Sequence, residues 1–250
     1  MNMVKTTEEE KRTAAEFYRY ALSMLNDAGF AFLVGGAFAL NQYTEIHRDT
    51  KDLDIFCKAS EYPKILKHFA AQGYHTEITD SRWLAKVFFK DDYFMDIIFN
   101  TVNNICKVDD SWFENATPGK MCDVDVRFLS AEDLYWCKIY VQNRERFDGA
   151  DLNHLIVRYG DKMNWHRIWS QMGQHWQLLL SQLINFQFCY PSQRDLAPRW
   201  LMDELLEKAK EQYELPLPQE VLCLGPLIDQ TQYGIDVREW NYKTVTMRTV

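Results

Sequence analysis

The stretch HRDTKDLDIF, residues 47–56, places two aspartates inside a run that otherwise predicts a buried strand. Aspartate is uncommon in strands, and a buried carboxylate is costly unless it is paired or binds a cation. Because side chains alternate along a strand, Asp52 and Asp54 are predicted to point to the same face. Two neighbouring carboxylates repel each other unless a cation lies between them. The pair therefore favours a hard divalent ion such as Mg²⁺, which prefers carboxylate oxygens and completes its shell with water and phosphate.

The residues before this stretch separate it from an ordinary solvated pair of acids. FAFLVGG, residues 30–36, predicts a short buried strand that ends on Gly35 and Gly36. A helix is predicted to begin directly after the glycines, so backbone N–H groups at its N-terminus would be available to a phosphate. Arg48 and Thr50 immediately precede the acidic pair. This context predicts a site where a metal ion and phosphate groups meet.

Two further acidic features need separate interpretations. Asp96 lies within YFMDIIF, another apolar strand, and by itself it is as often a satisfied core or edge residue as a ligand. On a strand next to the first pair it would complete a three-carboxylate cluster able to hold two Mg²⁺ ions, with Asp96 placed to accept a proton from an attacking hydroxyl. A second Asp-x-Asp, Asp123 and Asp125, has no glycine turn before it, and we interpret it as a solvated face.

Together, LVGGAFAL, RDTKDLDIF and FMDIIF resemble the nucleotidyltransferase superfamily related to DNA polymerase β. That superfamily is marked by an apolar residue, two small residues that include glycine, a spacer, an acidic pair on a strand and a later single aspartate. DLYWCKIYVQNRERFDGADLNHLI, residues 133–156, resembles the abortive-infection and toxin-type members from prokaryotes, in which a helical lysine precedes Asp-x-x-Asp. The resemblance implies transfer of a nucleoside monophosphate from an NTP to an acceptor hydroxyl, with Mg²⁺ or Mn²⁺ as cofactor.

The resemblance also assigns roles to particular residues. It implies that Arg144 or Arg146 takes the place of the arginine that usually precedes the first aspartate of that motif. Taken without the resemblance, a lysine such as Lys138 on an amphipathic helix is more often a solvated surface residue. The implied catalytic and metal-binding residues are Asp52, Asp54 and Asp96, and the implied nucleotide-binding residues are Gly35, Gly36, Arg48, Thr50, Lys138, Asp148 and Asp151.

The order of patterns along the chain predicts an α+β protein with an α/β-type core, in which a mixed sheet is flanked by helices and followed by a helical C-terminal region. We expect a nucleotidyltransferase catalytic domain at 1–150 and a helical domain at 151–250. Thr6 or Thr7, and Ser60, are candidate N-caps. The predicted strands are 30–36, 52–57, 75–79, 83–89, 93–99 and 122–129. The predicted helices are 6–28, 37–46, 60–73 and 130–147, a Trp-rich buried stripe over 165–183, and a short helix or strand near 233–240.

Composition limits the classes of partner. The 250 residues carry a formal net charge of −8, which argues against a general nucleic-acid coat. The six cysteines are scattered without a C-x-x-C pair, as expected of reduced, mostly buried thiols. The chain shows no signal-peptide pattern and no window of about 18 apolar residues, so we expect a cytoplasmic protein without a membrane partner.

Two questions remain open from the sequence. The acceptor could be an RNA 3′ end, a protein hydroxyl or a small molecule, and the acidic composition favours the last two. The alternative function is a catalytically idle nucleotidyltransferase fold that serves as a binding or regulatory module of a toxin–antitoxin system. Because all three acids are present and degenerate members usually lose at least one, we favour the enzyme.

Overall fold

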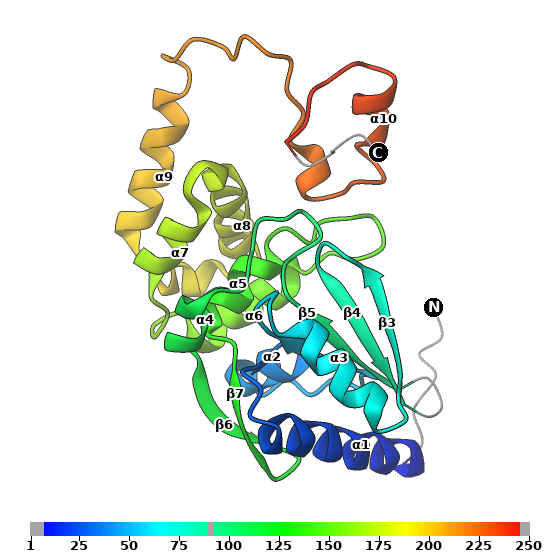
Figure 1. The fold of residues 1–250 in the computed structure, drawn as a ribbon. Helices are drawn as coiled ribbons and strands as arrows, with labels where there is room; N and C mark the ends of the chain where they lie inside the picture. The colour runs from blue at the N-terminus through cyan, green and yellow to red at the C-terminus, as the bar shows by residue number, and fades with distance from the viewer. Residues whose placement is uncertain (1–7, 90–92, 246–250) are drawn as a thin grey trace. The chain divides into compact units, whose positions relative to one another are not determined.

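The computed structural model describes residues 8–89 and 93–245, and the chain divides into two compact units, with the division between Ser130 and Ala131. The first unit contains the sheet, and the second is helical (Figure 1). This division lies earlier along the chain than the domain boundary predicted at residue 150. The helix predicted over 130–147 therefore begins the second unit instead of ending the first.

The first unit is built on a seven-stranded mixed sheet in the order β3-β4-β5-β2-β1-β7-β6. Strands β1 and β7 and strands β2 and β5 pair in parallel, and the other neighbours are antiparallel. The α+β class with a mixed sheet flanked by helices is thereby confirmed. The strands are β1 (Leu33–Val34), β2 (Asp52–Phe56), β3 (His75–Asp80), β4 (Leu84–Phe88), β5 (Phe94–Ile98), β6 (Thr117–Met121) and β7 (Val124–Phe128).

Helices of the first unit pack on this sheet through their apolar faces. The helix predicted over 6–28 is present over the described residues 8–27, and Phe17, Ala21 and Leu25 on its inner face are at most 1% exposed. Helix α1 contacts β7, α2 contacts β2, and α3 contacts β3 and β4. These helices are α1 (Glu8–Asp27), α2 (Gly36–Thr44), α3 (Tyr62–Ala71) and the short α4 (Asp110–Glu114).

The second unit is a set of helices whose buried residues come mostly from α5 to α9. Helix α5 packs on α6 and α7, and α8 packs on α6, α7 and α9. Most of the Trp-rich stripe is buried as predicted, with Trp169 only partly buried, and Gly173 at a positive φ of 47° divides the stripe between two helices. The elements are α5 (Ala131–Lys138), α6 (Gly149–Tyr159), α7 (Trp165–Met172), η1 (Gly173–His175), α8 (Trp176–Cys189), η2 (Pro191–Leu196), α9 (Arg199–Glu211), η3 (Gly225–Leu227) and α10 (Gly234–Arg238).

Several local predictions are wrong or lie outside the described residues. Ser60 is not an N-cap, because α3 begins after Glu61 and that position makes no side-chain capping hydrogen bond. Strand β6 lies in a region of mixed polarity where no strand was expected, and α5 ends at Lys138 instead of continuing to 147. The N-caps proposed at Thr6 or Thr7 lie outside the described residues.

The cysteines and the membrane prediction can be compared with the structure directly. All six cysteines fall in the described ranges and carry free thiols. The expectation that most of them are buried is wrong, because only Cys57 and Cys106 are buried and Cys189 is exposed. Among the described helices, none combines the length and the apolar character needed to cross a bilayer.

Candidate active site

Strand pairing in the first unit brings the three predicted carboxylates together. Asp52 and Asp54 lie on β2, and Asp96 lies on the parallel neighbour β5 directly opposite Asp54. One carboxylate oxygen from each residue lies within 4.8 Å of those from the other two. All three residues are partly buried. The predicted convergence of the three acids is therefore confirmed, and the arrangement offers only oxygen donors, which suits Mg²⁺ or Mn²⁺.

Gly35 and Gly36 lie where the chain leaves β1 and enters α2, beside the acidic pair. The backbone N–H of Gly35 donates to the carbonyl of Asp54 at 2.9 Å. Gly36 has a φ of 54°, and a Cβ at this position would overlap the carboxylate of Asp54. A Cβ on Gly35 would overlap the ring of Phe56. Both glycines are thus required by close approach between the turn and β2, a reason that the sequence pattern did not reveal.

Lys86 belongs to this site and was not predicted from the sequence. It lies on β4, directly opposite Asp96 in the antiparallel β4–β5 pair. Its Nζ is 2.6 Å from Oδ1 of Asp96, and both side chains are largely buried, at 19% and 13% exposed. The signal was available in the sequence, because Lys86 is a charged residue inside the apolar run WLAKVFF, as Asp96 is inside its own strand.

Burial and neighbouring charges act on the titratable groups around the carboxylates. Burial raises the pKa of Asp96 above its ordinary value, Lys86 opposes this shift, and the charge of Asp52 adds to it. Burial also raises the pKa of the Tyr18 hydroxyl, and the nearby charges of Asp52 and Asp54 raise it further. Tyr18 therefore stays protonated beside the acids, and it acts there as a neutral hydrogen-bond donor.

Arg48 and Thr50 lie next to the acidic pair and line a cavity of about 170 Å³ together with Tyr18 and Tyr93. The Thr50 hydroxyl donates to Oδ1 of Asp52, and the Tyr18 hydroxyl donates to the Thr50 carbonyl at 3.4 Å. A second cavity of about 260 Å³ also includes Arg48 in its wall. Neither tyrosine was predicted as a site residue, because each lies in an apolar segment where an aromatic side chain is expected to be part of the core.

The second Asp-x-Asp behaves as predicted. The side chains of Asp123 and Asp125 are 87% and 84% exposed, and each forms an ion pair with an exposed basic residue, Arg19 and Lys120 respectively. Solvent stabilises both carboxylates, so no bound cation is needed to explain them. The interpretation as a solvated face is confirmed.

In the second unit, Lys138 joins the two aspartates predicted with it. Its Nζ lies 2.7 Å from Oδ2 of Asp148 and 2.7 Å from Oδ2 of Asp151. The three side chains are only 6–8% exposed, so this is a buried ion network between the end of α5 and the start of α6. Arg146 donates to both carboxylate oxygens of Asp148, at 2.9 and 3.0 Å. Of the two arginines left open by the sequence, the structure therefore pairs Arg146 with this motif.

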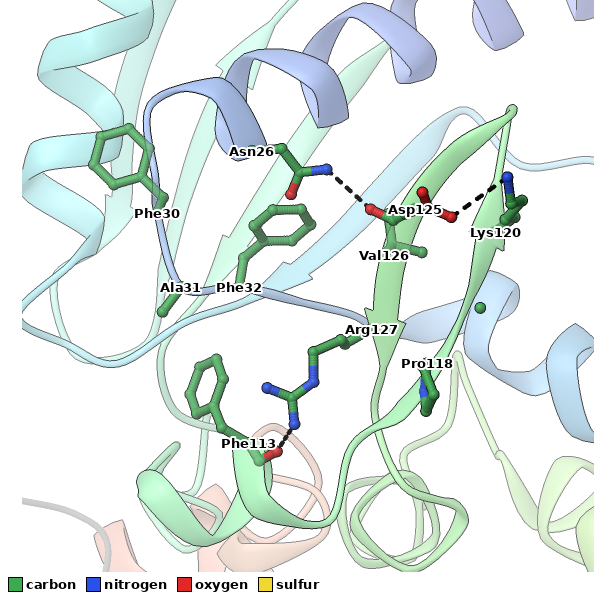
Figure 2. Close-up of a pocket in the computed structure, with 11 residues that line it drawn as sticks. Asn26, Phe30, Ala31, Phe32, Phe113, Pro118, Lys120, Asp125, Val126 and Arg127 are labelled. Atoms are coloured by element: carbon green, nitrogen blue, oxygen red, sulfur yellow. Dashed lines mark hydrogen bonds and ion pairs between the residues drawn. The ribbon is translucent and has the colours of Figure 1, made fainter.

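A further cavity of about 730 Å³, larger than the two beside Arg48, lies elsewhere in the first unit, between residues 26–32 and the β6–β7 hairpin (Figure 2). Its wall contains the rings of Phe30, Phe32 and Phe113 and the guanidinium of Arg127, which donates to the carbonyl of Phe113. None of the residues predicted to act in catalysis or nucleotide binding lines it. The size of a cavity therefore does not identify the candidate active site. The three clustered carboxylates identify it.

Several solved structures resemble this chain. The lincosamide antibiotic adenylyltransferase LnuA, solved with lincomycin bound, is 18% identical with a TM-score of 0.42, covering 60% of this chain and 96% of its own. JHP933 from Helicobacter pylori is 13% identical with a TM-score of 0.43, covering 84% and 99%. The antibiotic-resistance factor ANT(2'')-Ia is 12% identical with a TM-score of 0.42, covering 81% and 96%. At such identities and scores, the likeness says nothing about the substrate of this chain.

One protein-family model matches a longer part of the sequence than any single motif described above. No curated protein sequence matches the chain. Residues 5–184, well over half of the chain, match the family model described as "Uncharacterised nucleotidyltransferase". This range includes the glycine turn, the three aspartates and the Lys138 motif. The predicted superfamily is confirmed, and the chain belongs to this nucleotidyltransferase family.

Proposed function

We propose that this nucleotidyltransferase moves a nucleoside monophosphate from an NTP to an acceptor hydroxyl with the help of Mg²⁺ or Mn²⁺ held by Asp52, Asp54 and Asp96. The observation that carries the proposal is the convergence of three carboxylates from two neighbouring strands within 4.8 Å. Three partly buried acids this close are unfavourable by themselves, and divalent cations would relieve their repulsion. When bound, the metal would neutralise charge on the phosphates and lower the pKa of the attacking hydroxyl.

The residues around the cluster have roles that follow from their positions. Gly35 and Gly36 bring the N-terminus of α2 close to Asp54, and backbone N–H groups at a helix N-terminus favour phosphate. Arg48 and Thr50 line the adjacent cavity, where a guanidinium would pair with phosphate oxygens. Thr50 also donates to Asp52 and fixes the orientation of that carboxylate.

The proposed reaction is an in-line displacement at the α-phosphorus of the NTP. The acceptor oxygen forms a bond to the α-phosphorus while the bond to the bridging oxygen of the β-phosphate breaks, so that pyrophosphate leaves. Asp96 is proposed to accept the proton of the acceptor hydroxyl, because its carboxylate lies in the cluster beside the proposed metal site. The proposed nucleotide contacts include Lys138, Asp148 and Asp151, which form a buried ion network within the second unit.

The acceptor stays open among an RNA 3′ end, a protein hydroxyl and a small molecule. The formal charge of −8 disfavours extensive contact with RNA, because phosphate neutralisation needs an excess of lysine and arginine. Completeness of the carboxylate set supports an active enzyme over an idle binding module of a toxin–antitoxin pair.

Label transfer tests the proposal. The full chain is incubated with each α-³²P-labelled NTP, Mg²⁺ or Mn²⁺, and separate pools of RNA, protein and small alcohols. Transfer is expected with the wild type and is expected to be lost in Asp52→Asn and Asp54→Asn. The matched control is the double variant Asp123→Asn and Asp125→Asn, which removes an Asp-x-Asp of the same spacing from an exposed surface. Absence of NTP binding to the wild type with metal present, measured by calorimetry, would contradict the proposal.

A further inference from the structure

Lys86 occupies an unusual position for a lysine. It lies in the middle of β4, and its chain neighbours Ala85 and Val87 are fully buried. Its own side chain is 19% exposed, and an ammonium group that is largely removed from solvent needs an anionic partner. Its Nζ lies 2.6 Å from Oδ1 of Asp96 and 3.8 Å from the centre of the Phe94 ring. Both the carboxylate and the aromatic face therefore stabilise the ammonium group.

Strand register places Lys86 on the far side of Asp96 from the acidic pair. In the order β4-β5-β2, Lys86 pairs with Asp96 and Asp96 pairs with Asp54. Directly paired residues on neighbouring strands present their side chains on the same face of the sheet. The three residues therefore form one cross-strand row with Asp96 in the centre. Asp96 meets an ammonium group from one side and a carboxylate from the other.

This row restricts how Asp96 can act. The terminal torsion of aspartate is broad, so an isolated carboxylate would sample many orientations. The ion pair with Lys86 engages Oδ1 and leaves Oδ2 outside that pair. A lysine ammonium is a compact charge that can engage one oxygen, whereas the fork of an arginine would engage both. The choice of lysine thus keeps one oxygen of Asp96 available to the cluster.

We propose that Lys86 is a positioning residue for nucleotidyl transfer, which holds one oxygen of Asp96 and thereby presents the other toward Asp52 and Asp54. The inference rests on the proposed function, because it assumes that the three carboxylates bind a divalent metal. Groups that hydrogen-bond to metal ligands orient those ligands, and their loss weakens metal binding. In this proposal Lys86 acts through its ion pair with Asp96.

A purely electrostatic role for Lys86 would have the opposite consequence. A fixed positive charge beside a cation site repels the metal, so its removal would tighten metal binding. A positioning role requires that metal binding weakens when Lys86 is lost. The sign of the change in metal affinity therefore separates the two explanations.

The test is titration of the full chain with Mn²⁺ alone, followed by electron paramagnetic resonance of the free ion. Lys86→Met is expected to weaken Mn²⁺ affinity about 10–100-fold. Lys86→Arg, which keeps the charge, is also expected to weaken it, because the guanidinium would take both oxygens of Asp96. The control Lys64→Met removes an exposed lysine that pairs with Glu61, and it should leave the affinity unchanged.

A double-mutant cycle distinguishes positioning from general damage to the fold. In the Asp96→Asn background, Lys86→Met should cause little further loss, since the group through which Lys86 acts is already removed. Unchanged or tighter Mn²⁺ binding in either Lys86 variant would overturn the inference, and so would an equal loss in both backgrounds. Failure of the wild type to bind Mn²⁺ would instead overturn the proposed function itself. Lys86→Arg keeps a cation in the buried position, so the inference stays testable if Lys86→Met does not fold.

Discussion

At the scale of single residues, the carboxylate site depends on the absence of one side chain. Gly36 combines a positive φ of 54° with a backbone that lies against the carboxylate of Asp54. L-residues rarely adopt this conformation, and any Cβ would have to displace the carboxylate. Glycine is therefore required at residue 36 for two independent reasons, and only the second concerns the site.

Gly36→Ala is expected to abolish metal-dependent NTP binding, because the new methyl group would push the Asp54 carboxylate out of the cluster. Calorimetric titration with Mn²⁺ and NTP measures the effect. Gly29→Ala is the matched control, since Gly29 also has a positive φ, 71°, but a Cβ there would meet open space. Both variants should lose about 1–3 kcal/mol of stability through backbone strain. Equal NTP affinity in the two variants would contradict the packing argument.

At the scale of elements, the junction between α5 and α6 is held by charge. Helix α5 ends at Lys138, and α6 begins at Gly149, directly after Asp148. The Lys138 ammonium pairs with two buried carboxylates, and Arg146 supplies a second positive charge to the network from a more exposed position. The lysine therefore stabilises the start of the helical unit in addition to any contact that it makes with a nucleotide.

Lys138→Met should destabilise the helical unit by about 3–5 kcal/mol, the usual cost of leaving buried charge without its partner. Urea unfolding followed by circular dichroism measures the change. Lys210→Met removes a lysine from an exposed pair with Glu207, and its effect should stay within about 1 kcal/mol. A Lys138 variant as stable as this control, but deficient in NTP binding, would show that the lysine serves the nucleotide alone.

The connection between α7 and α8 contains a histidine whose protonation is unfavourable. His175 ends η1, is 8% exposed, and has its Nδ1 2.8 Å from the Tyr140 hydroxyl. Burial lowers the pKa of His175 below its ordinary value of 6.5. The unfolded chain therefore binds the proton on this histidine more tightly than the folded chain does. The contribution of neutral His175 to the free energy of unfolding is fully present above pH 6.5, and it is lost as the pH falls toward the lower pKa of the folded state.

His175→Gln should therefore reduce the loss of stability between pH 7 and pH 5.5, because the amide carries no charge that acid could create. The measurement is the free energy of unfolding from urea titrations across this range. His166→Gln serves as the control, since His166 is exposed. If the His175 variant loses stability with acid as steeply as the wild type, other groups dominate the pH response.

At the scale of the whole molecule, ligand binding should appear as added stability. A ligand present at about 100 times its dissociation constant stabilises the folded state by about 2.7 kcal/mol. For a chain of this size that corresponds to a rise in Tm of about 5–10 °C. Mg²⁺ with NTP should produce this rise in the transition of the unit that carries Asp52, and EDTA should reverse it. Asp54→Asn should show no rise, and a shift that survives EDTA would contradict a metal-dependent site.

Much of the fold was predictable because its signals are local. Each predicted strand of the sheet appears, as does the glycine turn, since periodicity and turn residues act over a few positions. The segment near 233–240, for which the sequence left a short helix or a strand open, contains helix α10. Strand β6 was missed because TPGKM contains proline and glycine, which are uncommon in strands. It forms at an edge of the sheet by pairing with β7, and this non-local pairing overrides its weak propensity.

The sequence by itself determined which residues carry charge inside apolar strands, and hence which acids were candidates for a metal site. It did not determine that Lys86 faces Asp96 or that Gly36 lies against Asp54. Those contacts depend on strand order and register, and a shift by one residue would have turned each side chain to the other face. Only the tertiary structure decided them, because register is fixed by the packing of the whole sheet and not by the residues of any one strand.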